Sequence, residues 1–137
     1  MIAKLGGLVA VAGLLVSTAP LLAHHSFAAE YDASNPVTLK GTVTKIEWTN
    51  PHARFYIDVK GADGGLTNWN MELASPNALQ RNGWTRRSLN VGDEVTVEGS
   101  AARDGSKMAN ARELTLANGR KVFARTSGGD APPPPVR

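Results

Sequence analysis

Apolar and polar residues alternate along two neighbouring stretches of this chain, from Val37 to Trp48 and from Ala53 to Val59. Alternation with a period of two is typical of a half-buried β-strand. In the first stretch the apolar positions change parity near Thr44-Lys45, which predicts a bulge there. We therefore expect a long bent strand and a second strand, joined by a tight corner over residues 48–52.

The rest of the chain predicts three or four more strands and one helix. A third strand with the same alternation covers Leu66 to Leu73. Ser75 is a suitable N-cap and Pro76 fits the first helical position, so a short helix is expected to run from Pro76 to Arg81. The later strands are expected to follow the turn at Gly92-Asp93, to cover Ala109 to Leu116, and to cover Arg120 to Ala124 after the Asn118-Gly119 hairpin turn.

This order of elements predicts a mainly β fold. A helix between the third and fourth strands of a five-stranded barrel is the order of the OB-fold. We expect a small five- to six-stranded OB-like barrel with one short helix between strands 3 and 4. The alternative is an open β-sandwich fragment. The barrel is favoured because it removes exposed sheet edges in a chain that has no cysteine and therefore no disulfide.

The ends of the chain have a different composition from the predicted barrel. Residues 1–23 combine one early lysine, an uncharged apolar run and a final Ala23, which is typical of a signal peptide cleaved after Ala23. The alternative is an uncleaved membrane anchor. Cleavage predicts a periplasmic or secreted protein with an N-terminal arm (24–36), a barrel domain (37–125) and a disordered proline-rich tail (126–137).

The charge of the chain is mild, at a formal net value of +3. Together with the predicted export, this charge leads us to expect a periplasmic protein or a small ligand as the partner, and not nucleic acid. We also expect no stable membrane span once the signal peptide has been removed.

Several short motifs together resemble a family of small exported bacterial proteins of unknown function, and this resemblance extends to about Phe123. It implies a periplasmic OB-like domain and no established activity. By topology alone, the barrel is also similar to periplasmic OB-fold proteins linked with stress tolerance. The motifs are His24-His25-Ser26-Phe27, Tyr31-Asp32, Gly41-Thr42-Val43, Trp48-Thr49-Asn50-Pro51-His52, Ser75 to Leu79 and Leu89-x-x-Gly92-Asp93.

The three histidines are candidate metal ligands. Cleavage after Ala23 would make His24 the first residue, so that its α-amine and imidazole could chelate one metal ion, with His25 or His52 completing the site. An amine with two imidazoles suits Cu(II), which prefers tetragonal nitrogen ligands. The alternative is that His24 and His25 are merely polar residues after the cleavage site and that His52 satisfies the backbone of its turn.

A second candidate site is the outward face of the second and third predicted strands, where OB barrels bind oligomers. Tyr56 could stack on a ligand and Arg54 could bind an anionic group. The alternative is an ordinary solvated sheet face. The candidate face consists of Arg54, Tyr56, Asn68, Asn70 and Glu72, while Met71 is expected to face the core.

Catalytic motifs are absent from the sequence: it contains no nucleophile elbow, no zinc-protease helix and no phosphate-binding loop. We therefore expect a non-catalytic binding or accessory module, with copper binding at the mature N-terminus as the alternative function. Arg81, Arg86 and Arg87 follow the predicted helix and could contact an anionic lipid or polysaccharide, although a solvated helix end favoured by the helix dipole is the commoner explanation.

Overall fold

The computed structural model describes residues 27–124. The predicted signal peptide, His24, His25 and the proline-rich tail lie outside these residues. The described elements, in chain order, are α1 (Phe27–Glu30), β1 (Tyr31–Glu47), β2 (Arg54–Lys60), β3 (Leu66–Glu72), α2 (Pro76–Arg81), β4 (Glu94–Ala102), β5 (Met108–Leu116) and β6 (Lys121–Phe123). No helix within residues 27–124 is long and apolar enough to cross a membrane.

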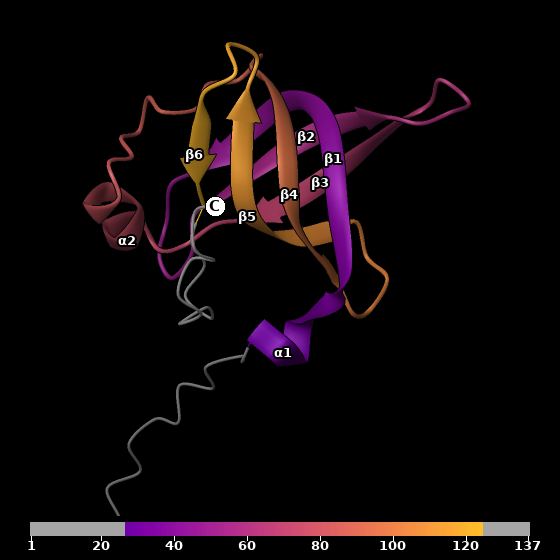
Figure 1. Cartoon of the computed structure of the whole chain (residues 1–137), viewed down its shortest axis with the longest axis horizontal. Helices are drawn as coiled ribbons and strands as arrows, with labels where there is room; N and C mark the ends of the chain where they lie inside the picture. Colours follow the sequence, from indigo (N-terminus) through magenta and orange to yellow (C-terminus); the bar gives the residue numbers. More distant parts are fainter. Residues whose placement is uncertain (1–26, 125–137) are drawn as a thin grey trace, which may run out of the picture.

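Five of the strands form a closed circuit of pairings, as the predicted fold class requires. β2, β1, β4 and β5 pair antiparallel in that order, and β3 pairs with both β2 and β5. The β3–β5 pairing is parallel and joins the two sides of the sheet. The short strand β6 extends the sheet beyond β5 (Figure 1). The fold is therefore mainly β, with the predicted order of strands around one short helix, α2.

The first strand contains the predicted bulge. The pairing of β1 with β2 shifts register between Val43 and Lys45. Gly41 lies where β1 coils over β2, and a Cβ atom at this position would be 2.5 Å from the backbone oxygen of Asp58. Glycine is therefore required for the two strands to approach this closely.

β1 begins six residues earlier than predicted, at Tyr31 rather than Val37. Tyr31 pairs with Ala102 of β4, and the register shifts between Tyr31 and Pro36. The side chain of Asp32 accepts hydrogen bonds from the backbone N–H and the hydroxyl of Ser34. The polar cluster that predicted a turn therefore forms an irregularity within the strand, and the second half of the predicted arm belongs to the sheet.

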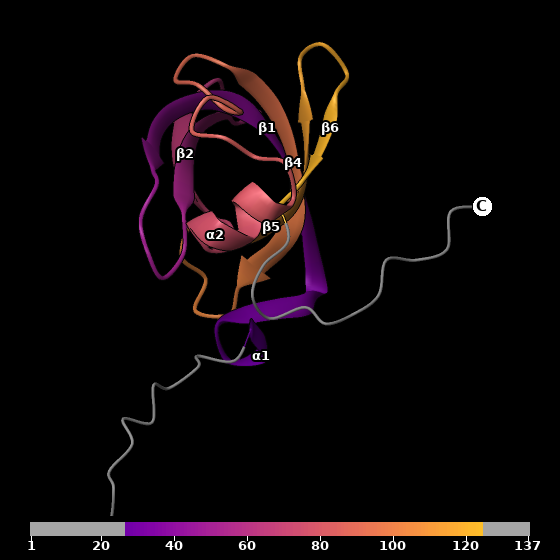
Figure 2. The same cartoon turned by 90° about the vertical axis from the view of Figure 1, so that its left-hand side faces the viewer.

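The helix α2 has the predicted bounds and closes one end of the barrel (Figure 2). The Ser75 hydroxyl accepts a hydrogen bond from the N–H of Ala78 at 3.3 Å, which confirms the N-cap. Leu79 is fully buried, and Trp84 just beyond the helix is also buried. These two apolar side chains cover the same end of the core.

The core side chains of β2 and β3 follow the alternation predicted for these strands. Phe55, Ile57 and Met71 are fully buried between β2, β3 and the rest of the barrel, whereas Leu116 is only partly buried. The remaining large, fully buried core side chains include Val43, Leu73, Leu79, Val95, Val97 and Leu114.

Candidate functional site

Glu72, the last residue of β3, is buried, although it belongs to the outward face of the sheet. This burial excludes the alternative that Glu72 lies on an ordinary solvated face. β5 pairs alongside β3 at this point, and the beginning of β1 covers the carboxylate from outside. Burying a carboxylate costs free energy unless the group is paired and hydrogen-bonded. The partners of Glu72 therefore define the candidate site.

Four donors surround the two oxygens of Glu72. Oε1 accepts from His52 Nδ1 at 2.8 Å and from Asn110 Nδ2 at 3.4 Å. Oε2 accepts from the Tyr31 hydroxyl at 3.0 Å and from Arg54 Nη2 at 2.5 Å. We call these five residues the Glu72 cluster. No buried polar side-chain atom among residues 27–124 is left without a hydrogen-bond partner.

The sheet register brings the cluster together. Arg54 lies directly opposite Glu72 on β2, and Asn110 lies beside Glu72 in the parallel pairing with β5. His52 comes from the corner between β1 and β2. Arg54 also donates to the Asn70 amide oxygen at 3.2 Å, so the guanidinium is held on two sides.

The N-terminal part of the described chain is fixed to this cluster. The rings of Phe27 and Tyr31 lie 5.7 Å apart, and Tyr31 is almost completely buried. Arg103 donates from Nε to the carbonyl of Ala28 at 2.7 Å, and its backbone N–H donates to the carbonyl of Glu30 at 2.9 Å. These contacts hold α1 below the barrel, where Figure 1 shows it.

Burial and the contact with Glu72 raise the pKa of Tyr31, and Glu72 also determines which ring nitrogen of His52 carries a proton. Burial of the Tyr31 phenol, reinforced by the nearby Glu72 charge and the hydrogen bond to it, raises the pKa of Tyr31 above its ordinary value of 10.0. The contact between His52 Nδ1 and Glu72 needs a proton on Nδ1, so in the neutral imidazole the lone pair lies on Nε2.

The other predicted face residues lie in further rows of the same two strands, outside the cluster. The Tyr56 hydroxyl donates to Glu47 at 3.2 Å, and the Lys45 ammonium lies 5.1 Å from the centre of the Tyr56 ring. Asn68 donates to Asp58 at 2.8 Å. The face is therefore a set of mutually bonded polar pairs, and it is joined to the cluster through Arg54, which donates to both Glu72 and Asn70.

Sequence reasoning placed Tyr31 only as one of two aromatic anchors for the arm, and it missed Asn110 altogether. A weak signal for Asn110 exists, because alanines flank it on both sides in β5. Small residues at successive positions indicate a strand that is covered on both faces, and a polar side chain in such a strand needs an internal partner.

Comparison with solved structures gives weak similarities. Two crystal forms of the S. cerevisiae mitochondrial single-stranded DNA-binding protein Rim1 match at 14% and 20% identity, each with a TM-score of 0.48, over 61% of this chain and 93% and 92% of theirs. The N-terminal domain of PriB from Thermoanaerobacter tencongensis matches at 23% identity and a TM-score of 0.43, over 61% of this chain and 97% of that one. At this level the similarity concerns the fold.

These similarities correct one prediction. Charge and export led us to exclude nucleic acid as a partner, but Rim1, which shares the fold, is a single-stranded DNA-binding protein. The exclusion is therefore wrong and is withdrawn, although a fold similarity of this kind does not assign a ligand to this chain.

Sequence comparison gives the family. No curated protein matches the chain. The model of one protein family does match, over residues 11–111, which include the Glu72 cluster and most of the described strands. The chain therefore belongs to the family of unknown function DUF6152.

Proposed function

We propose that this protein is an exported, non-catalytic binding or accessory module of the periplasm, and that its binding site is the rim of the Glu72 cluster. The observation that carries this proposal is that buried Glu72 holds two side chains, His52 and Arg54, which each remain 28% exposed. Donors that are already oriented bind a ligand with a smaller loss of conformational entropy. The export part of the proposal rests on the sequence of residues 1–23.

The chemistry of the rim supports binding more than catalysis. Imidazole and guanidinium N–H groups recognise ligands that carry hydrogen-bond acceptors, such as carboxylate, phosphate or carbonyl oxygens. The two oxygens of Glu72 already accept four hydrogen bonds. Four bonds use the lone-pair directions of a carboxylate, so Glu72 is poorly placed to take a proton from a substrate.

Titration of the labelled protein with short probes, followed by amide NMR shifts, tests this proposal. The probes are a thymidine oligonucleotide, a sugar phosphate and a short acidic peptide. We expect at least one probe to shift residues 52–56 and 70–72, and His52→Ala, which removes a partly exposed donor of the rim, to weaken that binding about tenfold. Val91→Ser, which changes an exposed side chain on the loop before β4, is the control. Shifts confined to other surfaces, or equal affinities for both variants, would reject the rim as the site.

A second function, metal binding, is favoured by the contact between His52 and Glu72. Metal-binding histidines commonly donate their second ring N–H to a carboxylate, which fixes the ring and raises the basicity of the binding nitrogen. The 2.8 Å contact from Nδ1 supplies this arrangement for His52 Nε2. Within residues 27–124 no three His, Asp or Glu side chains are grouped to hold a metal, so the site would need His24 or His25.

The position of Phe27 supports this second candidate. Phe27 packs on Tyr31, whose hydroxyl reaches the same carboxylate that orients His52. His25 precedes Phe27 by two residues, a length of chain of about 7 Å when extended. We propose that the α-amine and imidazole of His24, with His25 or His52, bind Cu(II) beside this cluster.

Copper titration of protein exported and cleaved by a bacterial host tests the second candidate. We expect one equivalent of Cu(II) to bind with a nitrogen-rich electron paramagnetic resonance signal, once mass spectrometry confirms a chain that starts at His24. His24→Ala, or one residue added before His24, should weaken binding by about tenfold or more because each removes a chelating nitrogen. The matched control is Asn35→Ala. Substoichiometric binding that none of these changes affects would eliminate the copper site.

A further inference from the structure

A separate hollow lies at the other end of β4 from the Glu72 cluster. Its volume is about 280 Å³, and it is formed by the loop before β4 and the turn between β5 and β6. Tyr31 pairs with Ala102 at one end of β4, whereas Glu94 at the other end lines the hollow. At about 3.3 Å per residue, the length of β4 separates the two places by about 26 Å.

Internal hydrogen bonds fix the walls of the hollow. In the loop before β4, the Asn90 N–H donates to the Asp93 carboxylate at 2.9 Å. In the β5–β6 turn, the Arg120 N–H donates to the Asn118 side chain at 2.9 Å. Both loops therefore present their side chains from a fixed backbone, which is the preorganisation that a binding site needs.

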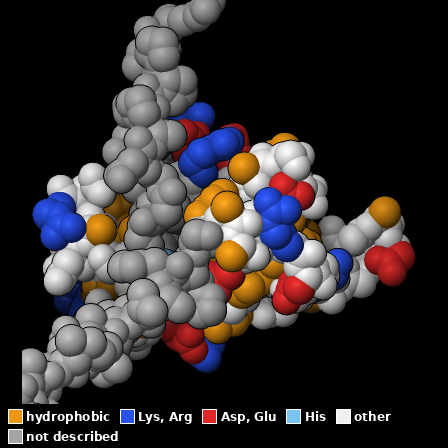
Figure 3. All heavy atoms as spheres, turned by 90° about the horizontal axis from the view of Figure 1, so that it is seen from below, with side chains coloured by type: hydrophobic (Ala, Val, Ile, Leu, Met, Phe, Trp, Pro, Cys, Tyr) orange, Lys and Arg blue, Asp and Glu red, His pale blue; other side chains and the backbone are white. Residues whose placement is uncertain are grey.

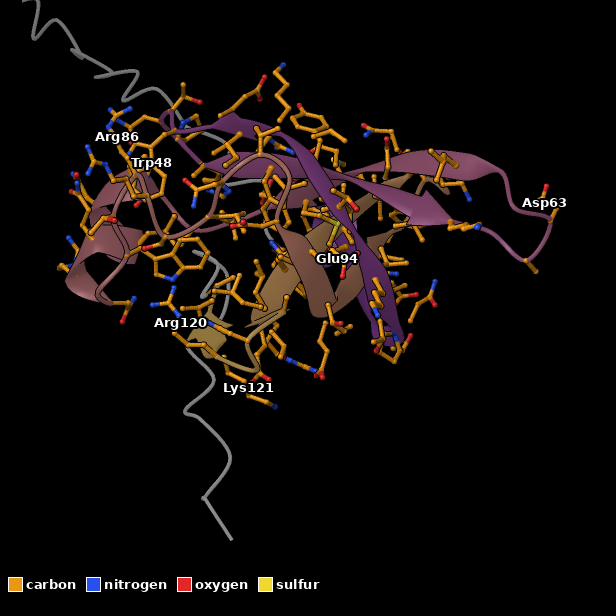
Figure 4. The ribbon with its side chains drawn as sticks, turned by 90° about the horizontal axis from the view of Figure 1, so that it is seen from above. Trp48, Asp63, Arg86, Glu94, Arg120 and Lys121 are labelled. Carbon is orange, nitrogen blue, oxygen red and sulfur yellow. The ribbon has the colours of Figure 1, made fainter. Side chains whose placement is uncertain are left out.

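Two arginines supply the positive charge of the hollow, which Asp93 and Glu94 also line. Arg87 comes from the loop and Arg120 from the turn, and both line the hollow. Their backbone N–H groups are bonded locally, but within residues 27–124 neither guanidinium pairs with a carboxylate. Figure 4 shows Arg120 at the β6 end of the molecule and Glu94 nearer the middle of the view. Acidic and basic side chains are interspersed on the face seen in Figure 3.

We propose that this hollow binds a small polyhydroxylated anion, with its carboxylate or phosphate group held by Arg87 and Arg120. Guanidinium groups match the planar geometry of such anions and form charge-assisted hydrogen bonds with them. The amides of Asn90 and Asn118 provide donors and acceptors for hydroxyl groups. The Glu94 carboxylate repels the anionic group of the ligand and accepts hydrogen bonds from its hydroxyl groups. The site therefore selects ligands that carry an anionic group and hydroxyl groups. This binding is independent of the function proposed for the Glu72 cluster.

NMR titrations with inorganic phosphate, glucose 6-phosphate, glucuronate and neutral glucose test the proposal. We expect shifts at residues 87–94 and 116–120 with glucose 6-phosphate, glucuronate or both, and weaker effects with phosphate or glucose alone. Comparing glucose 6-phosphate with glucuronate distinguishes a phosphate from a carboxylate ligand. Arg87→Gln and Arg120→Gln should each weaken binding about tenfold, while Glu94→Gln should strengthen it severalfold by removing a like charge.

The matched control is Arg112→Gln, which changes an exposed arginine that already pairs with Glu98. All four substituted side chains are exposed to solvent. An amide spectrum that is unchanged away from the substituted residue shows that each variant is folded. If no probe shifts the hollow at millimolar concentration, or if Arg112→Gln weakens binding as much as Arg87→Gln, the hollow is not a specific site. An unaltered or weakened affinity in Glu94→Gln would overturn the assigned orientation of the anion.

Discussion

Replacing Arg54 by alanine is expected to lower the free energy of unfolding by about 3 kcal/mol. Within residues 27–124, the substitution removes the only guanidinium that contacts Glu72, whose side chain is 5% exposed. A buried carboxylate that loses its cationic partner retains its desolvation cost without the compensating attraction. Urea unfolding at neutral pH, followed by tryptophan fluorescence, measures the change from the transition midpoint and slope.

The control for this prediction is another arginine–glutamate pair in the same protein. Arg112 lies 3.5 Å from Glu98, and the two side chains are 69% and 43% exposed. Arg112→Ala should cost less than about 0.5 kcal/mol because water already solvates both charges. Equal losses for the two alanine variants would mean that burial of Glu72 does not determine the strength of its pairing.

A second substitution separates the charge of Glu72 from its hydrogen bonds. Glu72→Gln keeps a side-chain acceptor for Tyr31 but removes the buried negative charge. In the background of Arg54→Ala this change should restore part of the lost stability, with a coupling energy of about 1 kcal/mol or more. Additive effects would show that Arg54 contributes by packing rather than by pairing with the charge.

Local patterns in the sequence were sufficient for most of the fold. Alternation gave the bounds of β2 and β3 to within one residue, and the Ser75-Pro76 pair gave the start of α2. The parity change in β1 gave the bulge before Lys45. Each of these features depends on neighbours along the chain, which is why one sequence reveals them. The early start of β1 was missed because its residues 32–35 have turn chemistry inside a pairing that β4 imposes.

The candidate site was only partly predictable because it depends on contacts between distant segments. Parity correctly assigned Arg54 and Glu72 to one face, but alternation cannot tell a solvated face from one that other segments cover. The cover comes from Tyr31, 41 residues before Glu72, and from Asn110, 38 residues after it. The parallel pairing of β3 with β5 places Asn110, and the pairing of β1 with β4 at Ala102 places Tyr31. No local signal in these strands specifies either pairing.

Tyr31 should make the protein lose stability in alkaline solution. In the unfolded chain its phenol ionises near the ordinary pKa of 10.0, whereas burial, the Glu72 charge and the hydrogen bond to Glu72 raise the pKa in the folded state. The stabilisation from this phenol is therefore complete below pH 10 and falls as the pH rises above 10, where the unfolded state gains by ionising. Each pH unit above 10 should cost about 1.4 kcal/mol from this group.

Comparison with Tyr31→Phe isolates that effect. The lysines and Tyr56 titrate in both proteins, so their contributions to the pH dependence cancel. At pH 8 the variant should be less stable by about 1 kcal/mol because it lacks the hydrogen bond to Glu72. Above pH 10 the wild type should lose up to about 1.4 kcal/mol per pH unit that the variant retains, so the difference in stability should shrink and then change sign as the pH rises. Urea unfolding of both proteins at intervals from pH 8 to about pH 12 measures the crossing. Parallel curves without a crossing would place the phenol in contact with water, and Glu72 would then lack the cover that defines the cluster.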